Sequence, residues 1–111
     1  MPMTTIEYCE KLAEQVPEMQ VVLKEHIDDY DQLLPNVFFG DLTRYVLSDG
    51  PGRLRIVEFL EESFHRLGAE VEELIAVSFI ENLESEYDLE EALRGLAAVN
   101  LKKEWRRQRF G

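Results

Sequence analysis

The sequence predicts an all-α protein, and three observations support this prediction. Apolar residues recur at helical spacing along most of the 111 residues, and no stretch shows a convincing strand pattern. Only six glycines and four prolines are present, fewer turn residues than a sandwich or barrel needs. The centre of residues 71–83 is apolar on almost every side, which is typical of a buried helix. We therefore expect a single domain over residues 1–111, with six or seven short helices packed around residues 71–83 and helix pairs that could stack in a repeat-like manner.

Local signals place the boundaries of these helices. Thr4, followed three residues later by Glu7, fits a capping box at the first helix. Pro17 and Pro35 each suit the opening of a helix, and Gly68 is expected to end the fourth. The expected helices cover about residues 5–15, 18–31, 36–48, 53–67, 70–83, 88–94 and 96–107.

Three residues on the predicted apolar stripes carry particular expectations. Cys9 lies on the stripe of the first helix, so we expect a buried structural thiol rather than a nucleophile. His26 is expected at the edge of the core. Gly40, in the middle of the third helix, costs about 1 kcal/mol relative to alanine, and a close helix crossing would explain it.

Glu81 continues the apolar row of the central helix, and two interpretations of it remain open. A half-buried carboxylate there would need a partner, for which Arg44, Arg66 and Arg94 are the candidates. Alternatively, Glu81 reaches solvent at the end of its helix.

The net charge of −11 is spread unevenly along the chain. Residues 1–101 contain 22 acidic and 7 basic side chains, a balance of −15, whereas residues 102–111 contain one acidic and five basic side chains, a balance of +4. Such an acidic body repels nucleic acid and anionic membrane and attracts a basic partner. Solubility alone is the competing explanation. We expect the basic segment 102–111 to associate with the acidic body rather than with RNA or lipid.

The chain shows no sign of a membrane segment or a leader peptide. It contains no apolar run of about 18 residues, and its first residues have neither a basic nor an apolar region. A single cysteine excludes an internal disulfide framework. We therefore expect a cytoplasmic protein.

No motif for catalysis, metal binding or cofactor binding stands out. Glu62 and His65 have the i, i+3 spacing of metal sites in helix bundles, but those sites need a second such pair. Neither a nucleophile–base pair nor a phosphate-binding glycine loop is present. We expect a protein that is not an enzyme and that needs no cofactor or metal. The alternative is an enzyme that uses scattered carboxylates such as Glu58, Glu61 and Glu62.

Two short segments place a tyrosine among carboxylates, and these are the candidate partner-binding sites. Carboxylates attract a basic partner, and tyrosine is a frequent anchor in interfaces. The candidate residues are Asp28, Asp29 and Asp31 around Tyr30, and Glu84, Glu86 and Asp88 around Tyr87. The two segments are expected at opposite ends of the domain, with only one of them as the site. We favour residues 84–88, because they are expected in a loop with less structural duty, whereas Tyr30 continues an apolar stripe.

Two motifs, Leu34-Pro35-Asn36-Val37-Phe38-Phe39-Gly40-Asp41 and Val77-Ser78-Phe79-Ile80-Glu81-Asn82-Leu83, resemble a family of small bacterial all-helical proteins of uncharacterised function. The resemblance covers about residues 30–100 and implies no catalytic residues. In size and charge the chain is also similar to immunity proteins that neutralise bacterial toxins. We therefore expect a non-catalytic acidic module whose partner is a basic protein, with a toxin domain as the best guess. An adaptor or complex subunit unrelated to toxins is the alternative.

Overall fold

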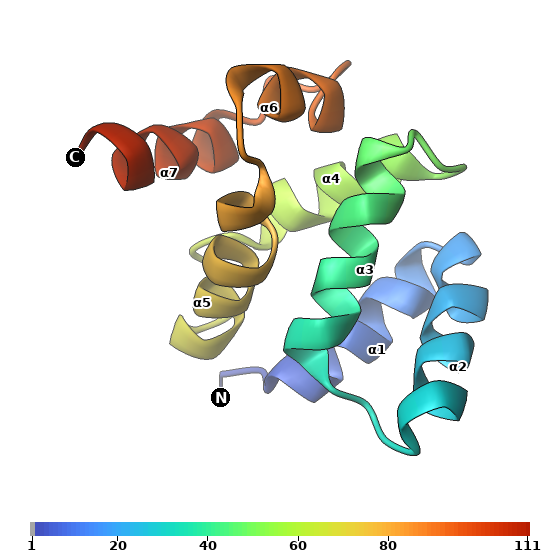
Figure 1. The fold of residues 1–111 in the computed structure, drawn as a ribbon. Helices are drawn as coiled ribbons and strands as arrows, with labels where there is room; N and C mark the ends of the chain where they lie inside the picture. The colour runs from blue at the N-terminus through green and yellow to red at the C-terminus, as the bar shows by residue number, and fades with distance from the viewer. Residues whose placement is uncertain (1) are drawn as a thin grey trace.

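Figure 1 shows the computed structural model of the chain, which describes residues 2–111. These residues form seven α-helices and one 3₁₀ helix, η1, without a strand, so the prediction of an all-α protein is confirmed. The elements are α1 (Thr5–Gln15), α2 (Glu18–Tyr30), α3 (Pro35–Leu47), α4 (Arg53–Ser63), α5 (Ala69–Ser78), η1 (Ile80–Asn82), α6 (Glu86–Ala92) and α7 (Val99–Phe110). Within the described residues, no helix has the length and apolar character needed to cross a membrane.

The helices pack around α3 and α5, which lie next to each other at the centre of the molecule (Figure 1). Helix α1 contacts α2, α3 and α5, whereas α7 contacts α4 and η1. Helix α6 also contacts α3. Because α5 packs mainly on α3, two helices earlier in the chain, the arrangement is not a regular stack of successive helix pairs.

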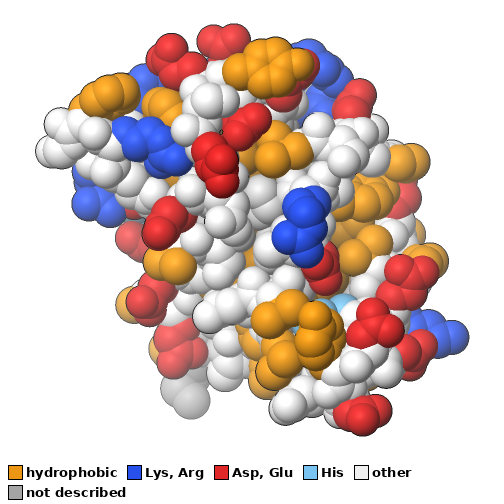
Figure 2. Space-filling model, viewed as in Figure 1, with side chains coloured by type: hydrophobic (Ala, Val, Ile, Leu, Met, Phe, Trp, Pro, Cys, Tyr) orange, Lys and Arg blue, Asp and Glu red, His pale blue; other side chains and the backbone are white. Residues whose placement is uncertain are grey.

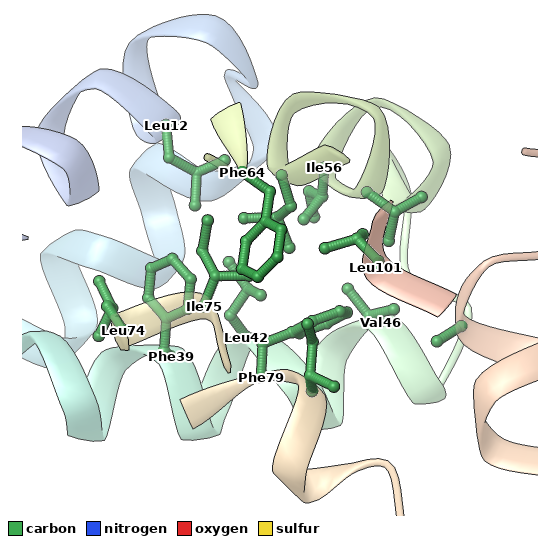
Figure 3. Packing of buried hydrophobic residues seen from close by; sticks show 14 of the residues in the cluster. Leu12, Phe39, Leu42, Val46, Ile56, Phe64, Leu74, Ile75, Phe79 and Leu101 are labelled. Carbon is green, nitrogen blue, oxygen red and sulfur yellow. The ribbon is translucent and has the colours of Figure 1, made fainter. Parts of the chain in front are cut away.

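The core lies between α3 and α5 and receives apolar side chains from α1, α4 and α7 as well. Figure 3 shows Leu42 of α3 and Ile75 of α5 directed into the same interior as the ring of Phe79. These three side chains are completely buried. The prediction that the centre of residues 71–83 forms the middle of the core is therefore correct.

Residues 71–83 do not form the single continuous helix that we predicted. Helix α5 ends at Ser78, and η1 follows at Ile80. The Ser78 carbonyl accepts a hydrogen bond from Nδ2 of Asn82 at 2.8 Å. The buried hydroxyl of Thr43 shares its single proton between the Phe39 carbonyl at 2.7 Å and the Ser78 carbonyl at 3.1 Å. A continuing helix would have satisfied this carbonyl with a backbone N–H. Side-chain donors replace that bond and stabilise the break.

Helix α5 is also not buried on all sides. Val71, Leu74 and Ile75 are buried, but the side chain of Val77 is 48% exposed. A helix with one buried face can carry an apolar residue on its exposed face as well. Its sequence then resembles that of a helix buried on every side. The prediction of burial on every side is therefore wrong at Val77.

Left-handed backbone conformations move several helix boundaries from their predicted positions. Helix α4 ends at Ser63 rather than near residue 67, and His65 follows with a φ of 71°. Gly68, with a φ of 106°, is the N-cap of α5 rather than the end of α4. Helix α7 begins later than predicted because Ala98 has a φ of 47°, and Val99 is exposed instead of facing the core.

The N-termini of α1 and α7 are capped in different ways. At α1, the predicted capping box between Thr4 and Glu7 is present, with N···O distances of 2.9 and 3.1 Å. At α7, the carboxylate of Glu61 from α4 accepts the backbone N–H groups of Asn100 and Leu101 at 3.0 and 2.9 Å. Glu61 is thus a helix cap rather than the free surface carboxylate expected from the sequence.

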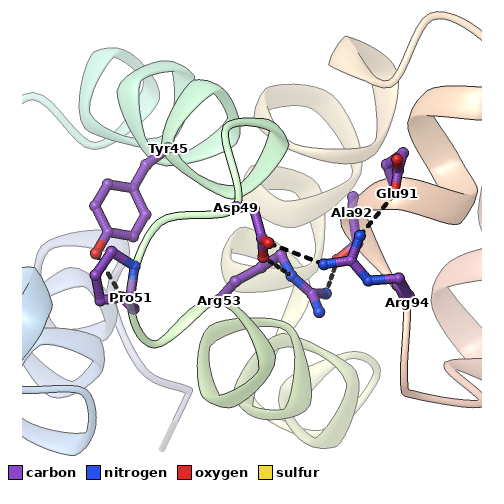
Figure 4. A network of polar contacts seen from close by, with 7 residues as sticks. All are labelled: Tyr45, Asp49, Pro51, Arg53, Glu91, Ala92 and Arg94. Atoms are coloured by element: carbon purple, nitrogen blue, oxygen red, sulfur yellow. Dashed lines mark hydrogen bonds and ion pairs between the residues drawn. The ribbon is translucent and has the colours of Figure 1, made fainter.

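A buried arginine joins α4 to the end of α6 (Figure 4). Nε of Arg53 donates to Asp49 at 2.8 Å, and Nη1 donates to the carbonyl of Ala92 at 2.9 Å. The other carboxylate oxygen of Asp49 accepts from Arg94 at 2.9 Å. Asp49 therefore bridges two guanidinium groups that come from segments about 40 residues apart in the sequence.

The Phe79 side chain supplies the first testable prediction. Phe79→Ala should lower the free energy of unfolding by about 3–5 kcal/mol, because it removes a buried ring and leaves a cavity. Urea denaturation measures this change. The control is Val77→Ala, which changes an exposed side chain nearby and should shift stability by about 0.5 kcal/mol or less. Equal effects of the two substitutions would contradict the placement of Phe79 in the core.

The second prediction concerns pH. Hydrogen bonds from Arg53 and then Arg94 hold the pKa of Asp49 below its usual value. Because the folded-state pKa is lower than the unfolded one, the carboxylate stabilises the fold above about pH 4, and this stabilisation is lost as the pH falls through the folded-state pKa.

Asp49→Asn keeps a residue that tolerates the left-handed φ of 56° and removes the charge. The variant should melt at a lower Tm than the native protein at about pH 7, and the difference should shrink towards about pH 3. Thermal unfolding across this range measures it. A difference that stays constant with pH would show that the charge of Asp49 does not contribute.

Candidate functional site

Burial raises the pKa of two titratable side chains in the described interior, Cys9 and Tyr8. Among residues 2–111, no group of three or more His, Cys, Asp or Glu side chains is placed to hold a metal ion. Cys9 is buried, and burial raises the pKa of its thiol to about 12, so it is not a nucleophile near neutral pH. Burial likewise raises the pKa of the Tyr8 hydroxyl. Cys9 is therefore the structural thiol that the sequence predicted, and the candidate sites lie on the surface.

Exposed apolar side chains and carboxylates occur close together in the sequence at the end of α2 and at the start of α3. Ile27, Tyr30 and Val37 are 39%, 46% and 38% exposed. Figure 2 shows hydrophobic side chains gathered over the start of α3, with carboxylates beside them over the end of α2. We call this surface the α2 patch, and it consists of Ile27, Asp28, Asp29, Tyr30, Asp31 and Val37.

The buried ring of His26 lies beneath the α2 patch, next to the ring of Tyr30. The centroid of the His26 ring lies 4.9 Å from that of Tyr30 and 5.8 Å from that of Phe38. Nε2 accepts the backbone N–H of Leu34 at 2.9 Å, so the neutral ring carries its proton on Nδ1. One imidazole thus connects the end of α2 to the start of α3. His26 lies at the edge of the core as predicted, whereas the expectation that Tyr30 belongs to the core is wrong.

The second acidic segment, residues 84–88, is not the loop that the sequence predicted. Helix α6 begins at Glu86, and Ser85 is its N-cap. The Asp88 carboxylate accepts the backbone N–H of Glu84 at 3.1 Å, so it has a structural role. Glu84 and Glu86 are exposed, and Tyr87 is 70% exposed. The argument that this segment has little structural duty is therefore wrong for Asp88.

A groove of about 390 Å³ lies between α3 and the residues that lead into α6. We call it the α3 groove. Its lining residues are Gly40, Thr43, Arg44 and Leu47 of α3, together with Asn82, Glu84 and Asp88. Arg44 is exposed and forms an ion pair with Asp41 on the same helix.

Gly40 has no packing role in the described structure. A Cβ atom at this position would come no closer than 4.0 Å to a neighbouring atom, the terminal nitrogen of Arg44. The predicted close crossing with another helix of this chain is therefore wrong. The missing side chain instead opens the floor of the α3 groove.

A larger hollow of about 640 Å³ lies between α5 and α7, and three of its polar lining residues, Glu104, Arg107 and Gln108, bind one another. The buried carboxylate of Glu104 accepts two hydrogen bonds from Arg107, at 2.8 and 2.5 Å. These bonds lower the pKa of Glu104 despite its burial. Gln108 donates to Glu104 and to the carbonyl of Ala76. This cluster was not predicted, because in the sequence residues 102–111 stand out only as a basic segment.

The basic segment forms most of α7 and is docked on the body of the protein. The Arg109 guanidinium lies 4.5 Å from the centroid of the Trp105 ring and donates to the carbonyl of Leu83 at 2.5 Å. Nε1 of Trp105 donates to the same carbonyl at 2.6 Å. The hydrogen bonds of Trp105, Gln108 and Arg109 that join residues 102–111 to the body thus go to the backbone carbonyls of Leu83 and Ala76 rather than to acidic side chains of the body.

Glu81 is the middle residue of η1 and is exposed, which agrees with the interpretation that it reaches solvent. Two of its three predicted partners have other carboxylates. Arg44 pairs with Asp41, and Arg94 pairs with Asp49.

Fold and surface together define an all-helical domain with acidic and apolar side chains on one face. The family described as a domain of unknown function, DUF7674, matches residues 9–111. The chain therefore belongs to this family. No curated protein and no solved structure matches it. The family agrees with the expected likeness to small helical proteins of uncharacterised function.

The open space at Gly40 leads to a third prediction. Gly40→Ala should raise the free energy of unfolding by about 0.5–1 kcal/mol, since alanine favours the helix and its methyl group meets no neighbour. The control is Gly50→Ala, whose Cβ would lie 2.5 Å from the Tyr45 ring and should be destabilising. Thermal unfolding measures both. A loss of stability in Gly40→Ala would show that a neighbour does occupy this space.

Proposed function

We propose that the protein is a non-catalytic module that binds a basic protein through the α2 patch. The observation that supports this proposal is the combination of exposed Ile27, Tyr30 and Val37 with the adjacent carboxylates of Asp28, Asp29 and Asp31. Protein interfaces combine an apolar centre that includes aromatic anchors with a polar rim. The carboxylates would attract and orient a partner rich in Lys and Arg, and the net charge of −11 would speed the encounter.

The α2 patch is a better primary site than the start of α6. Tyr87 is the one exposed large apolar side chain of α6, whereas Tyr30 has Ile27 and Val37 as exposed apolar companions. Moreover, Asp88 is used in the cap of α6. The α2 patch therefore offers both parts of an interface, and its aromatic anchor is supported by a buried histidine.

For the partner, we propose a basic toxin domain, which would make the protein an immunity or antitoxin protein. Small size, acidity and the absence of a motif for catalysis in the sequence support this choice. An adaptor or subunit of a complex unrelated to toxins would use the same surface. The neighbouring genes distinguish these two roles. A gene for a large secreted toxin immediately upstream would favour the immunity role, whereas a metabolic operon would favour the adaptor or subunit role. An enzyme that uses carboxylates is a weaker alternative, since Glu61 caps α7.

The fourth prediction tests the binding surface. A partner is isolated from the native host with the tagged protein and identified, and its Kd is measured at low and moderate salt. Reversal of Asp28, Asp29 and Asp31 to Lys should weaken binding by roughly 10- to 100-fold, with a smaller salt dependence than the native protein.

The charge-matched control reverses three exposed carboxylates on other helices, Glu10 of α1 and Glu58 and Glu62 of α4. This control changes the net charge by the same amount and should weaken binding much less. Equal losses in both variants would show that only total charge matters, and an unchanged Kd in the first variant would rule the α2 patch out.

A further inference from the structure

One exposed face of α3 connects the two acidic segments. Val37, Gly40, Arg44 and Leu47 recur at a spacing of three or four residues, so they lie in one row along the helix. Val37 belongs to the α2 patch, and the other three line the α3 groove. Figure 2 shows carboxylates, basic side chains and a hydrophobic cluster following one another on a single face of the molecule.

The middle of this face differs from its two ends. Each end is acidic, with Asp28, Asp29 and Asp31 at one and Glu84 and Glu86 at the other. In the middle, Arg44 is neutralised by Asp41, and Gly40 provides a low point without a side chain. A partner helix that crosses α3 from one acidic segment to the other would therefore meet negative charge, then a neutral shallow groove, then negative charge again.

We propose that the α2 patch, the α3 groove and the start of α6 form one continuous surface, occupied by a basic amphipathic helix of the partner that crosses α3 at Gly40. This inference rests on the proposed function and specifies how the partner is bound. Two helices approach more closely where the side chains between them are small. Lys and Arg residues towards the two ends of such a helix would face the two acidic segments.

A partner helix at this position would also explain why residue 40 is a glycine, because packing within the chain leaves room for a Cβ atom there. In α3, Gly40 is unfavourable for the helix, and a Cβ atom added there would meet only the terminal nitrogen of Arg44, at 4.0 Å. A partner helix at this position would use the space that the missing side chain leaves. Both acidic segments then contribute to binding, as the two ends of one site. From the sequence, we expected only one of them to be the binding site.

The fifth prediction tests the crossing at Gly40. Gly40→Leu should fold with an unchanged or higher Tm, because its Cβ enters open space and leucine favours helices. Its affinity for the isolated partner should fall by about tenfold or more. The control, Gln20→Leu, adds the same side chain at an exposed position of α2 and should bind normally. Gly40→Ala, with one added carbon, should give a smaller loss.

A second measurement uses a defined probe, a synthetic helical peptide of about 18 residues with Lys at both ends and Ala and Leu at helical spacing in the middle. Amide chemical shifts of the labelled protein should change at residues 28–31, along the exposed face of α3 and at residues 84–88. Gly40→Leu should reduce these changes. Failure of the peptide to bind, or shift changes confined to one acidic segment, would overturn the inference.

Charge reversal separates this inference from the proposed function. Reversal of Glu84 and Glu86 to Lys should weaken partner binding in addition to the effect of reversing the three aspartates of the α2 patch. If only the aspartate variant weakens binding, and Gly40→Leu binds like its control, the function stands and the continuous surface is wrong. If the aspartate variant binds normally, the proposed function itself fails.

Discussion

The packing of α5 against α3 is the contact on which the rest of the structure depends. Leu42 and Val46 of α3 meet Ile75 and Phe79, and this contact determines which face of α3 is buried. The opposite face is then left to the solvent, with Gly40 and Arg44 on it. The break after Ser78 belongs to the same contact, because Thr43 of α3 supplies a donor near its carbonyl. One face of α3 thus packs in the core, and the opposite face belongs to the candidate binding surface.

Features that depend on neighbouring residues could be predicted from the sequence. The capping box of Thr4 and Glu7, the buried thiol of Cys9 and the seven helices follow from spacing and local propensity. The acidic segments were found in the same way, from composition alone. Even here the start of α6 was missed, although Ser85 followed by Asp88 is a pattern that can cap a helix.

Features that depend on contacts between distant residues could not be predicted. Nothing near Glu61 in the sequence shows that it caps a helix 39 residues later. Nothing near Arg53 in the sequence shows that it is buried with the carbonyl of Ala92 as a partner. Similarly, the exposure of Tyr30 follows from the position of His26 and Leu34, and the open space at Gly40 follows from the absence of a helix across it. The candidate residues were therefore found from the sequence, whereas the surface that they form required the fold.

The cap that Glu61 provides has a consequence for the order in which the protein folds. An isolated helix of 12 residues, such as α7, is marginal in water, and α7 lacks a cap of its own. Its first free N–H groups are satisfied only when α4 is already in place, and Trp105 needs the carbonyl of Leu83. During synthesis α7 leaves the ribosome after α4 and Leu83, so the body formed by the earlier helices acts as the template on which α7 folds.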